Sequence, residues 1–256
     1  MTDWHETLGG NVRIVLEGTP ADASGQMPQT VRGAVEVKLA PGWHTYWRDP
    51  GASGIPPTFM LGDGSDVKDV RIDYPAPVWV ETDYGSYAGY KEPVVLPFEI
   101  ETGKKADVSF SGNLILGVCQ DICIPVVAPF DLMVKPSTST SQTDVMVAAA
   151  FQELPQPAPD DLVEVAFGDN TVTITVDQAL FENAQSEMPG VFAAIDGMNL
   201  AKPKLIKQTP DKAIYTSDIT YVGSGYETVS VNVTVVHGAD VHNARFVVAR
   251  SVIMTP

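Results

Sequence analysis

The chain has 256 residues, enough for two domains of ordinary size, and 44% of them are hydrophobic. A chain of this composition can bury real cores, which excludes a largely disordered protein. Sixteen Lys and Arg residues stand against 32 Asp and Glu residues, which gives a formal net charge of −16. Because so acidic a chain repels phosphate backbones and anionic lipid head groups, nucleic acids and membrane surfaces are poor candidates as partners.

No stretch approaches the roughly 18 consecutive apolar residues of a membrane-spanning helix, so direct insertion into a membrane is not expected. The first residues, Met1–Glu6, lack the basic and apolar regions of a secretory signal. Taken alone, this observation favours the cytoplasm. A sequence from which a signal had been removed would look the same, so these residues do not decide the compartment.

Alternation of apolar and polar residues dominates the first half of the chain. Val12–Glu17 and Val31–Leu39 show the period of two that is typical of half-buried strands. The same pattern returns in residues 94–100, 106–110 and 114–116. Gly and Pro clusters such as Asp49–Gly51 and Leu61–Gly64 separate these segments and indicate turns. Short strands punctuated in this way predict a β-sandwich.

The composition changes after residue 135. Pro136–Ser141 is small and polar, as linkers are, and a short helix is predicted over Val145–Leu154 with Thr143 or Asp144 as its cap. The proline-rich residues 155–159 end this helix.

Strand patterns resume beyond the linker. They cover residues 163–167, 171–176, 213–215, 228–236 and 245–249. A short helix is expected within Asp177–Glu187. The predicted fold is therefore all-β, with a sandwich over residues 1–135, a linker with a short helix over 136–159, and a second, smaller β-rich domain, itself sandwich-like, over 160–256.

The chain contains two cysteines, Cys119 and Cys123, which lie four positions apart. In a straight strand their Cα atoms would be about 13 Å apart, whereas a disulfide needs about 5.5 Å. The pair can therefore bond only if Gln120–Ile122 forms a three-residue hairpin tip between strands 114–118 and 124–127. Closing so small a loop adds only about 2 kcal/mol of stability. A short bridge at an exposed turn can open without unfolding its domain, which suits thiol–disulfide exchange.

Two alternatives stay open from the residues alone. The bridge could be structural, within a non-catalytic binding module that serves partner assembly or copper handling. A metal site is the other alternative, but structural zinc needs four ligands, and a blue-copper site needs His and Met near its Cys. Ile124–Val127 supplies neither His nor Met, so no metal and no cofactor is predicted.

Three blocks of the sequence resemble the N-terminal periplasmic domain of the DsbD and ScsB thiol–disulfide interchange proteins. They are Gly117–Pro125 around the cysteines, Pro41–Pro57 with its Trp43 and Trp47, and Tyr74–Pro97. The three-residue spacing between the cysteines is similar to that of the ScsB branch, because DsbD has a wider one. The transmembrane and thioredoxin-like regions of DsbD do not occur in these residues, so the chain is either a domain of a larger protein or a soluble member with a separate electron donor.

The resemblance implies an immunoglobulin-like domain of the periplasm that acts as a protein-disulfide reductase or electron relay. Its implied partners are a membrane-embedded electron donor of the DsbD/ScsB type and oxidised thioredoxin-like proteins. Cys119 and Cys123 would be the catalytic pair, with Cys123 as the attacking thiol. A cap loop would shield them, which assigns that role to Asp83 and Tyr84 and, more loosely, to Tyr87.

Other side chains near these motifs have simpler interpretations. His44 is expected to be a packing residue among the aromatic side chains of its block rather than a base or a ligand. Asp121 and Glu81 are carboxylates that could accept a proton near the thiols.

Overall fold

The computed structural model describes residues 1–18, 30–51, 54–82, 85–102, 107–136, 142–180, 188–223 and 227–249. The chain forms two compact units. The first contains Met1–Arg48, Gly54–Val78 and Gly89–Leu154; the second contains Asp49–Ser53, Trp79–Ala88 and Pro155–Pro256. No helix within the described ranges has the length and apolar character needed to cross a membrane.

One sheet of the first unit has five antiparallel strands in the order β1-β2-β3-β9-β6. The strands are β1 (His5–Thr7), β2 (Gly10–Leu16), β3 (Thr30–Leu39), β9 (Val94–Glu101) and β6 (Val70–Ile72). The alternating segments of the sequence supply the three long central strands, because their apolar residues share one face.

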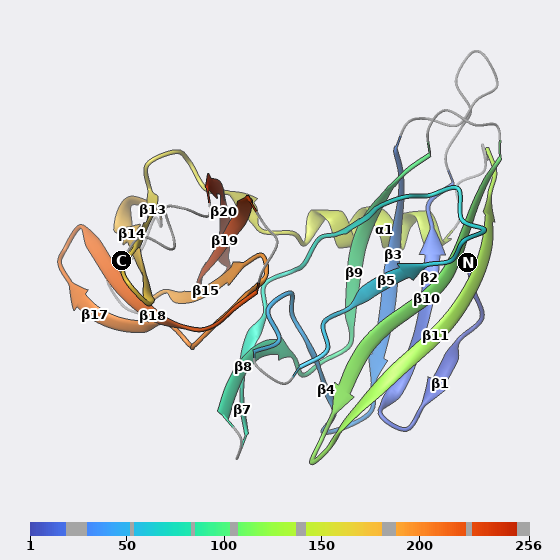
Figure 1. Cartoon of the computed structure of the whole chain (residues 1–256), viewed down its shortest axis with the longest axis horizontal. Coiled ribbons are helices and arrows are strands. Elements are labelled where there is room, and N and C mark those ends of the chain that lie inside the picture. The colour runs from blue at the N-terminus through green and yellow to red at the C-terminus, as the bar shows by residue number, and fades with distance from the viewer. Residues whose placement is uncertain are drawn as a thin grey trace. The chain divides into compact units, whose positions relative to one another are not determined.

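The other sheet has the order β11-β10-β4-β8-β7, and β5 pairs with β10 beside this path. Its strands are β11 (Cys123–Val134), β10 (Val108–Cys119), β4 (His44–Tyr46), β8 (Gly85–Tyr90), β7 (Val78–Thr82) and β5 (Thr58–Leu61). The long β10–β11 hairpin is the green ribbon of Figure 1. Val78 of β7 and Gly89–Tyr90 of β8 belong to the first unit, whereas Trp79–Ala88 belongs to the second.

Aromatic rings join the two sheets of the first unit. Phe59 lies 5.0 Å from Phe98 of β9 and 5.5 Å from Phe110 of β10, measured between ring centroids. Phe130 of β11 completes the cluster, 4.6 Å from Phe110. Because these rings come from both sheets and fill the space between them, the first unit is a β-sandwich.

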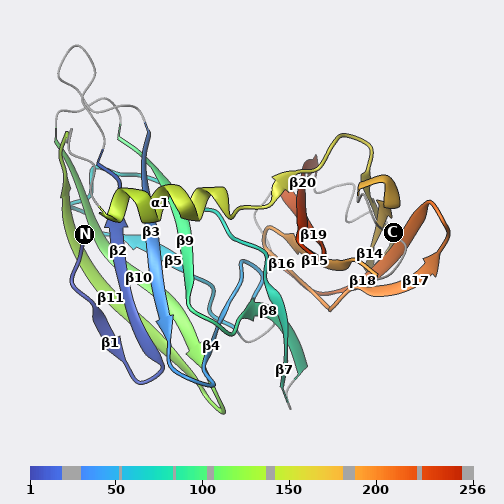
Figure 2. The ribbon, with the colours of Figure 1, turned by 180° about the vertical axis from the view of Figure 1, so that it is seen from behind.

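The helix α1 (Gln142–Gln152) lies across β2, β3 and β9, as Figure 2 shows. It begins three residues before the predicted start at Val145. Val147 packs against Val15 and Ala34 of the sheet and is fully buried. Asp144 is also buried, and its Oδ1 accepts a hydrogen bond of 2.7 Å from the backbone N–H of Gly18. The helix therefore covers one face of the five-stranded sheet.

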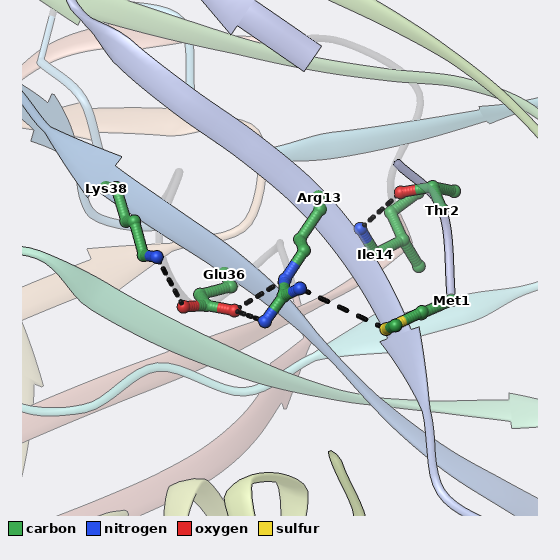
Figure 3. Close-up of polar contacts among 6 residues, drawn as sticks. All are labelled: Met1, Thr2, Arg13, Ile14, Glu36 and Lys38. Carbon is green, nitrogen blue, oxygen red and sulfur yellow. Dashed lines mark hydrogen bonds and ion pairs between the residues drawn. The ribbon is translucent and has the colours of Figure 1, made fainter. Parts of the chain in front are cut away.

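Hydrogen bonds hold the N-terminal segment beside β2 (Figure 3). Thr2 donates its N–H to the carbonyl of Ile14, and its Oγ1 accepts the N–H of Ile14 at 3.0 Å. Arg13 of β2 pairs with Glu36, its cross-strand neighbour on β3, at 2.7 Å. Lys38 lies 3.9 Å from the other oxygen of Glu36. These contacts stabilise the outer edge of the sheet without touching the cysteines.

The second unit contains a nine-stranded sheet in the order β12-β20-β19-β15-β16-β18-β14-β13, with β17 beside β18. Its strands are β12 (Gln156–Pro157), β20 (Asp240–Ala249), β19 (Thr228–His237), β15 (Gly190–Ile195), β16 (Met198–Leu200), β18 (Lys212–Val222), β14 (Thr171–Asp177), β13 (Val163–Phe167) and β17 (Lys204–Gln208). All pairings are antiparallel except that of β12 with β20.

A separate apolar core lies within this second unit. Alternate residues of β14, namely Val172, Ile174 and Val176, are fully buried in it. The helix expected within 177–187 is a single 3-10 turn over Gln178–Leu180, and residues 181–187 lie outside the described ranges. The all-β fold with a second, smaller β-rich domain is thus confirmed. The exact domain boundaries stay a prediction.

Candidate functional site

The two cysteines form a disulfide at the end of the β10–β11 hairpin. Cys119 is the last residue of β10 and Cys123 the first of β11; they are register partners with Cα atoms 4.1 Å apart. Gln120 donates its N–H to the carbonyl of Ile122 at 3.2 Å, which closes the tip. The three-residue tip deduced from the cysteine spacing is present.

The two sulfur-bearing residues differ in their access to solvent. Cys119 is 1% exposed, whereas Cys123 is an exposed residue. Ile122, beside Cys123 on the tip, is 68% exposed and apolar. A reactant approaching the hairpin therefore meets Cys123, while Cys119 stays within the fold.

Tyr46 contacts both sulfur atoms. Its hydroxyl oxygen lies 2.8 Å from Sγ of Cys123 and 3.0 Å from Sγ of Cys119. Because a disulfide sulfur carries no proton, the hydroxyl is the donor in this oxidised state. Burial raises the pKa of Tyr46, so the hydroxyl keeps its proton at neutral pH. The sequence analysis gave Tyr46 no role at the site.

The register between β4 and β10 brings Tyr46 to this position. Cys119 pairs with His44 and Val118 with Thr45, so the next residue of β4, Tyr46, lies opposite Gly117. Gly117 and Cys119 are two residues apart on β10 and therefore share one face of the sheet with Tyr46. The Tyr46 ring lies against Gly117, and a Cβ on Gly117 would stand 2.8 Å from Cε2 of that ring. A side chain at position 117 would therefore displace the ring that reaches the sulfurs.

The rest of β4 anchors the site in the sheet. Thr45 is fully buried and donates its hydroxyl to the carbonyl of Gly117 at 2.7 Å. His44 is buried opposite Cys119; this burial, and to a lesser degree the charge of Lys91, lowers the pKa of its imidazole. A neutral His44 agrees with the packing role expected for it.

The segment expected to form the cap is a β-hairpin rather than a loop. Residues 78–82 form β7 and 85–90 form β8, while Asp83 and Tyr84 lie outside the described residues. Tyr87 is half-buried on β8. The C-terminal end of β8 pairs with β4: Gly89 lies opposite Tyr46, and Tyr90 lies opposite Thr45. The strand that follows the expected cap is thus hydrogen-bonded to the strand that carries Tyr46.

The two candidate proton acceptors have different surroundings. Asp121 is exposed on the hairpin tip. Glu81 of β7 forms an ion pair of 2.6 Å with Lys202, a partner that the sequence alone did not indicate. Among the residues that the structure describes, no three His, Cys, Asp or Glu side chains gather as a metal site would require.

Comparison with known proteins agrees with this geometry. Residues 13–135 match the family described as thiol:disulfide interchange protein DsbD, N-terminal. The matched stretch holds β4, β10 and β11, and hence the disulfide and Tyr46. The resemblance inferred from the motifs around the cysteines is confirmed, and thiol–disulfide interchange is the chemistry of this family.

A solved structure extends the likeness over both units. The N-terminal periplasmic domain of ScsB from Proteus mirabilis matches with a TM-score of 0.71 and 21% identity, covering 97% of this chain and 98% of that one. This match shows a shared fold, and the immunoglobulin-like sandwich is confirmed. A conserved domain protein from Bacillus anthracis, 14% identical over 97% of this chain and 90% of that one, has a TM-score of 0.29, too low to indicate a common fold. No curated protein sequence matches the chain.

Proposed function

We propose that the chain is a periplasmic protein that relays electrons through the Cys119–Cys123 pair to other thiol proteins. The observation that carries the proposal is the unequal exposure of the two cysteines on one tight hairpin. An exposed Cys123 offers a sulfur to an incoming partner, and a buried Cys119 is held beside it to complete the exchange. The match to a thiol:disulfide interchange family supports the same chemistry.

The exchange proceeds in two balanced steps. In the reduced protein the Cys123 thiolate attacks a substrate disulfide; a bond forms between Cys123 and one substrate sulfur, and the other substrate sulfur leaves as a thiolate and takes a proton. The Cys119 thiolate then attacks the Cys123 sulfur and releases the second substrate thiol. The substrate gains two electrons and two protons, and the disulfide of this chain is formed.

Tyr46 assists whichever sulfur carries negative charge. Thiolates are stabilised by hydrogen-bond donors, and a hydroxyl within 3.0 Å of both sulfurs can serve either one. This matters most for Cys119, because a buried thiolate without a donor would be strongly disfavoured.

The β7–β8 hairpin is the proposed cover of the pair, with Asp83, Tyr84 and Tyr87 as the shielding residues. Aromatic rings over sulfur make favourable contacts and exclude water. The described part of the hairpin supports this role because β8 pairs with β4 beside Tyr46. The proposed partners are a membrane-embedded donor of the DsbD/ScsB type and oxidised thioredoxin-like proteins.

Single cysteine variants test the exchange. Cys119→Ser removes the resolving thiol, so its Cys123 should form a stable mixed disulfide with an oxidised thioredoxin-like protein, visible on a non-reducing gel and by intact mass. Cys123→Ser is the matched control, because its remaining thiol is buried. If neither variant traps the partner, the proposed exchange is wrong; if only Cys123→Ser traps it, the roles of the two cysteines are reversed.

A further inference from the structure

The end strand of the six-stranded sheet carries a row of exposed apolar residues that begins beside Cys123. Strand β11 alternates between exposed and covered positions along its length. Pro125, Val127 and Pro129 are exposed on the same face as Cys123, and Val127 is 50% exposed. The outward face of an antiparallel sheet normally carries polar residues. Because these side chains lie outside the core, folding does not account for their apolar character.

Two neighbouring strands widen this row. The register places Ile115 of β10 beside Val127, and Asn113 of β10 beside Pro129. Met60 of β5 pairs with Asn113 in turn and is 57% exposed. The residues that we call the apolar patch are Met60, Ile115, Pro125, Val127 and Pro129.

The surroundings of the apolar patch are nearly free of charge. Among the outward-facing residues that the structure describes on β5, β10 and β11, Asp131 is the one charged side chain, and it lies beyond Pro129 as seen from Cys123. The whole chain, by contrast, has a net charge of −16. Charged residues are depleted at the centres of protein interfaces, so this composition is typical of a docking surface.

The backbone of β11 indicates that a partner uses the face of the sheet rather than its edge. Gly117 donates its N–H to the carbonyl of Ile55, so Gly117 and Pro125 face each other as a non-hydrogen-bonded pair. The main-chain groups of Pro125, and of every second residue after it, therefore point away from β10. Pro125 and Pro129 have no N–H to offer there, which disfavours the addition of a strand from another protein.

The position of Cys123 indicates which molecule covers the apolar patch. A protein that forms a mixed disulfide with Cys123 lies against the residues around that sulfur. One side of an ordinary protein interface covers about 800 Å², which is a circle about 16 Å in radius. Along a strand, Val127 is about 13 Å from Cys123, and Met133 is about 33 Å away. A protein bonded to Cys123 therefore reaches Pro125 and Val127 and leaves Met133 uncovered.

We propose that the apolar patch is the docking surface for an oxidised thiol protein whose own surface beside its reactive disulfide is apolar and uncharged. This inference rests on the proposed exchange at Cys123. It gives the reaction a preference for protein partners, because a small disulfide reaches Cys123 without touching the patch. Apolar contacts hold the partner in place while the sulfur atoms exchange.

The test compares two oxidants of the reduced full chain, oxidised thioredoxin and a small aromatic disulfide. Val127→Glu and Val127→Lys each place a charge in the apolar patch, and both should slow the reaction with thioredoxin about tenfold. Both should leave the reaction with the small disulfide unchanged, because the sulfur atoms are unaltered. If the two charges had opposite effects on the thioredoxin rate, electrostatic steering would replace apolar docking as the explanation, and the inference would be wrong.

Val127→Thr is a milder variant of the same position. Threonine keeps the shape and the strand preference of valine and replaces one methyl group with a hydroxyl. The thioredoxin rate should fall about threefold, without a change in folding that could account for it. A fall of equal size with the small disulfide would place the effect at the sulfur atoms and contradict docking.

Met133→Glu is the matched control. Met133 is 55% exposed on the same face of the same strand, beyond the reach of a protein bonded to Cys123. Its rates with both oxidants should equal those of the wild type. If Met133→Glu slowed the thioredoxin reaction as much as Val127→Glu does, the added charge would act regardless of its place, and the inference would fail.

The failure of this inference is distinguishable from the failure of the proposed exchange. If Cys119→Ser traps thioredoxin and Val127→Glu still reacts with it at the wild-type rate, the docking surface is wrong and the exchange function stands. If neither cysteine variant traps thioredoxin, the exchange function fails, and the docking inference fails with it. Sedimentation tests another occupant: a wild-type dimer that Val127→Glu separates would make the apolar patch a contact between two copies of this chain and overturn the inference.

Discussion

The ring of Tyr46 occupies the place where a side chain on Gly117 would stand. A Cβ on Gly117 would lie 2.8 Å from Cε2 of the Tyr46 ring, closer than real Cβ atoms approach their neighbours, and 3.1 Å from Cδ2, which is a tight contact. The N–H of Gly117 also donates to the carbonyl of Ile55, and its carbonyl accepts the hydroxyl of Thr45, so hydrogen bonds hold its backbone on both sides. The glycine therefore sets how close the hydroxyl of Tyr46 comes to the sulfurs.

Gly117→Ala is expected to push the Tyr46 ring away from the disulfide. The overpacked side chain should cost about 1–3 kcal/mol of unfolding free energy and slow thiol–disulfide exchange. Denaturant unfolding and the rate of exchange with a dithiol measure the two effects. Gly64→Ala is the control, because a Cβ there meets no atom within 4 Å. An unchanged exchange rate in Gly117→Ala would show that the ring position is unimportant.

Tyr46→Phe removes the hydroxyl and keeps the ring. Hydrogen bonds to charged groups contribute about 1.5–3 kcal/mol, so loss of the donor to the leaving thiolate should slow disulfide opening by a dithiol at least about tenfold. Tyr74→Phe is a matched control, since its buried hydroxyl bonds to the carbonyl of Pro57 instead. Equal rates for the two variants would remove Tyr46 from the mechanism.

Ile122 is expected to serve protein partners rather than the chemistry itself. It is apolar, 68% exposed and adjacent to Cys123, so a partner bonded to Cys123 would cover it. Ile122→Ser should lower the exchange rate with an oxidised thioredoxin-like protein about three- to tenfold and leave reduction by a small phosphine unchanged. Val247→Ser, which alters an equally exposed apolar residue of β20, should affect neither rate. A parallel fall in both rates would indicate a change in sulfur reactivity instead.

Reduction of the disulfide should cost little stability. Its loop spans five residues, which corresponds to about 2 kcal/mol in the chain-entropy description. Denaturant unfolding of the oxidised and the reduced protein measures the difference, and the variant Cys119→Ala/Cys123→Ala shows any effect of the reductant itself. A loss above about 4 kcal/mol would favour the alternative of a binding module with a structural bridge.

The cysteine spacing and the alternating strands predicted a large part of this site. Two cysteines four apart can bond only across a tight turn, and Leu114–Val118 already showed the pattern of the strand that leads to it. The role of Tyr46 could not be read in the same way. Strand β4 is three residues long and wholly buried, so it shows no alternation, and its pairing with β10 joins residues more than 70 positions apart.

The contacts of the β7–β8 hairpin with β15 and with Lys202 could not be predicted from the sequence for a similar reason. The stack of Trp79 on Phe192 and the pair between Glu81 and Lys202 each join residues over 100 positions apart. No local pattern encodes such contacts, and the segment was expected to be a cap loop because the resemblance to the DsbD/ScsB family implied one there. Only the tertiary fold shows that part of the N-terminal half belongs to the second unit.

Asp49 makes the unfolding free energy depend on pH in mildly acidic solution. Burial raises the pKa of its carboxyl group to about 6, although the N–H groups of Gly51 and Leu200 partly oppose the shift. Between about pH 4 and 6 the folded protein therefore keeps a proton that the unfolded chain has lost. The unfolding free energy should fall as pH rises through this range, by about 3 kcal/mol in total, and level off above it.

Asp49→Asn isolates this contribution, because the amide stays neutral and its oxygen can still accept one of the two N–H groups. Denaturant unfolding at a series of pH values should give a wild-type curve that falls, relative to that of Asp49→Asn, from about pH 4 to 6 and runs parallel to it above. Asp160→Asn, which alters an exposed carboxylate of the same unit, should leave the wild-type curve unchanged. Parallel curves for wild type and Asp49→Asn over the whole range would mean that Asp49 is not held protonated in the folded state.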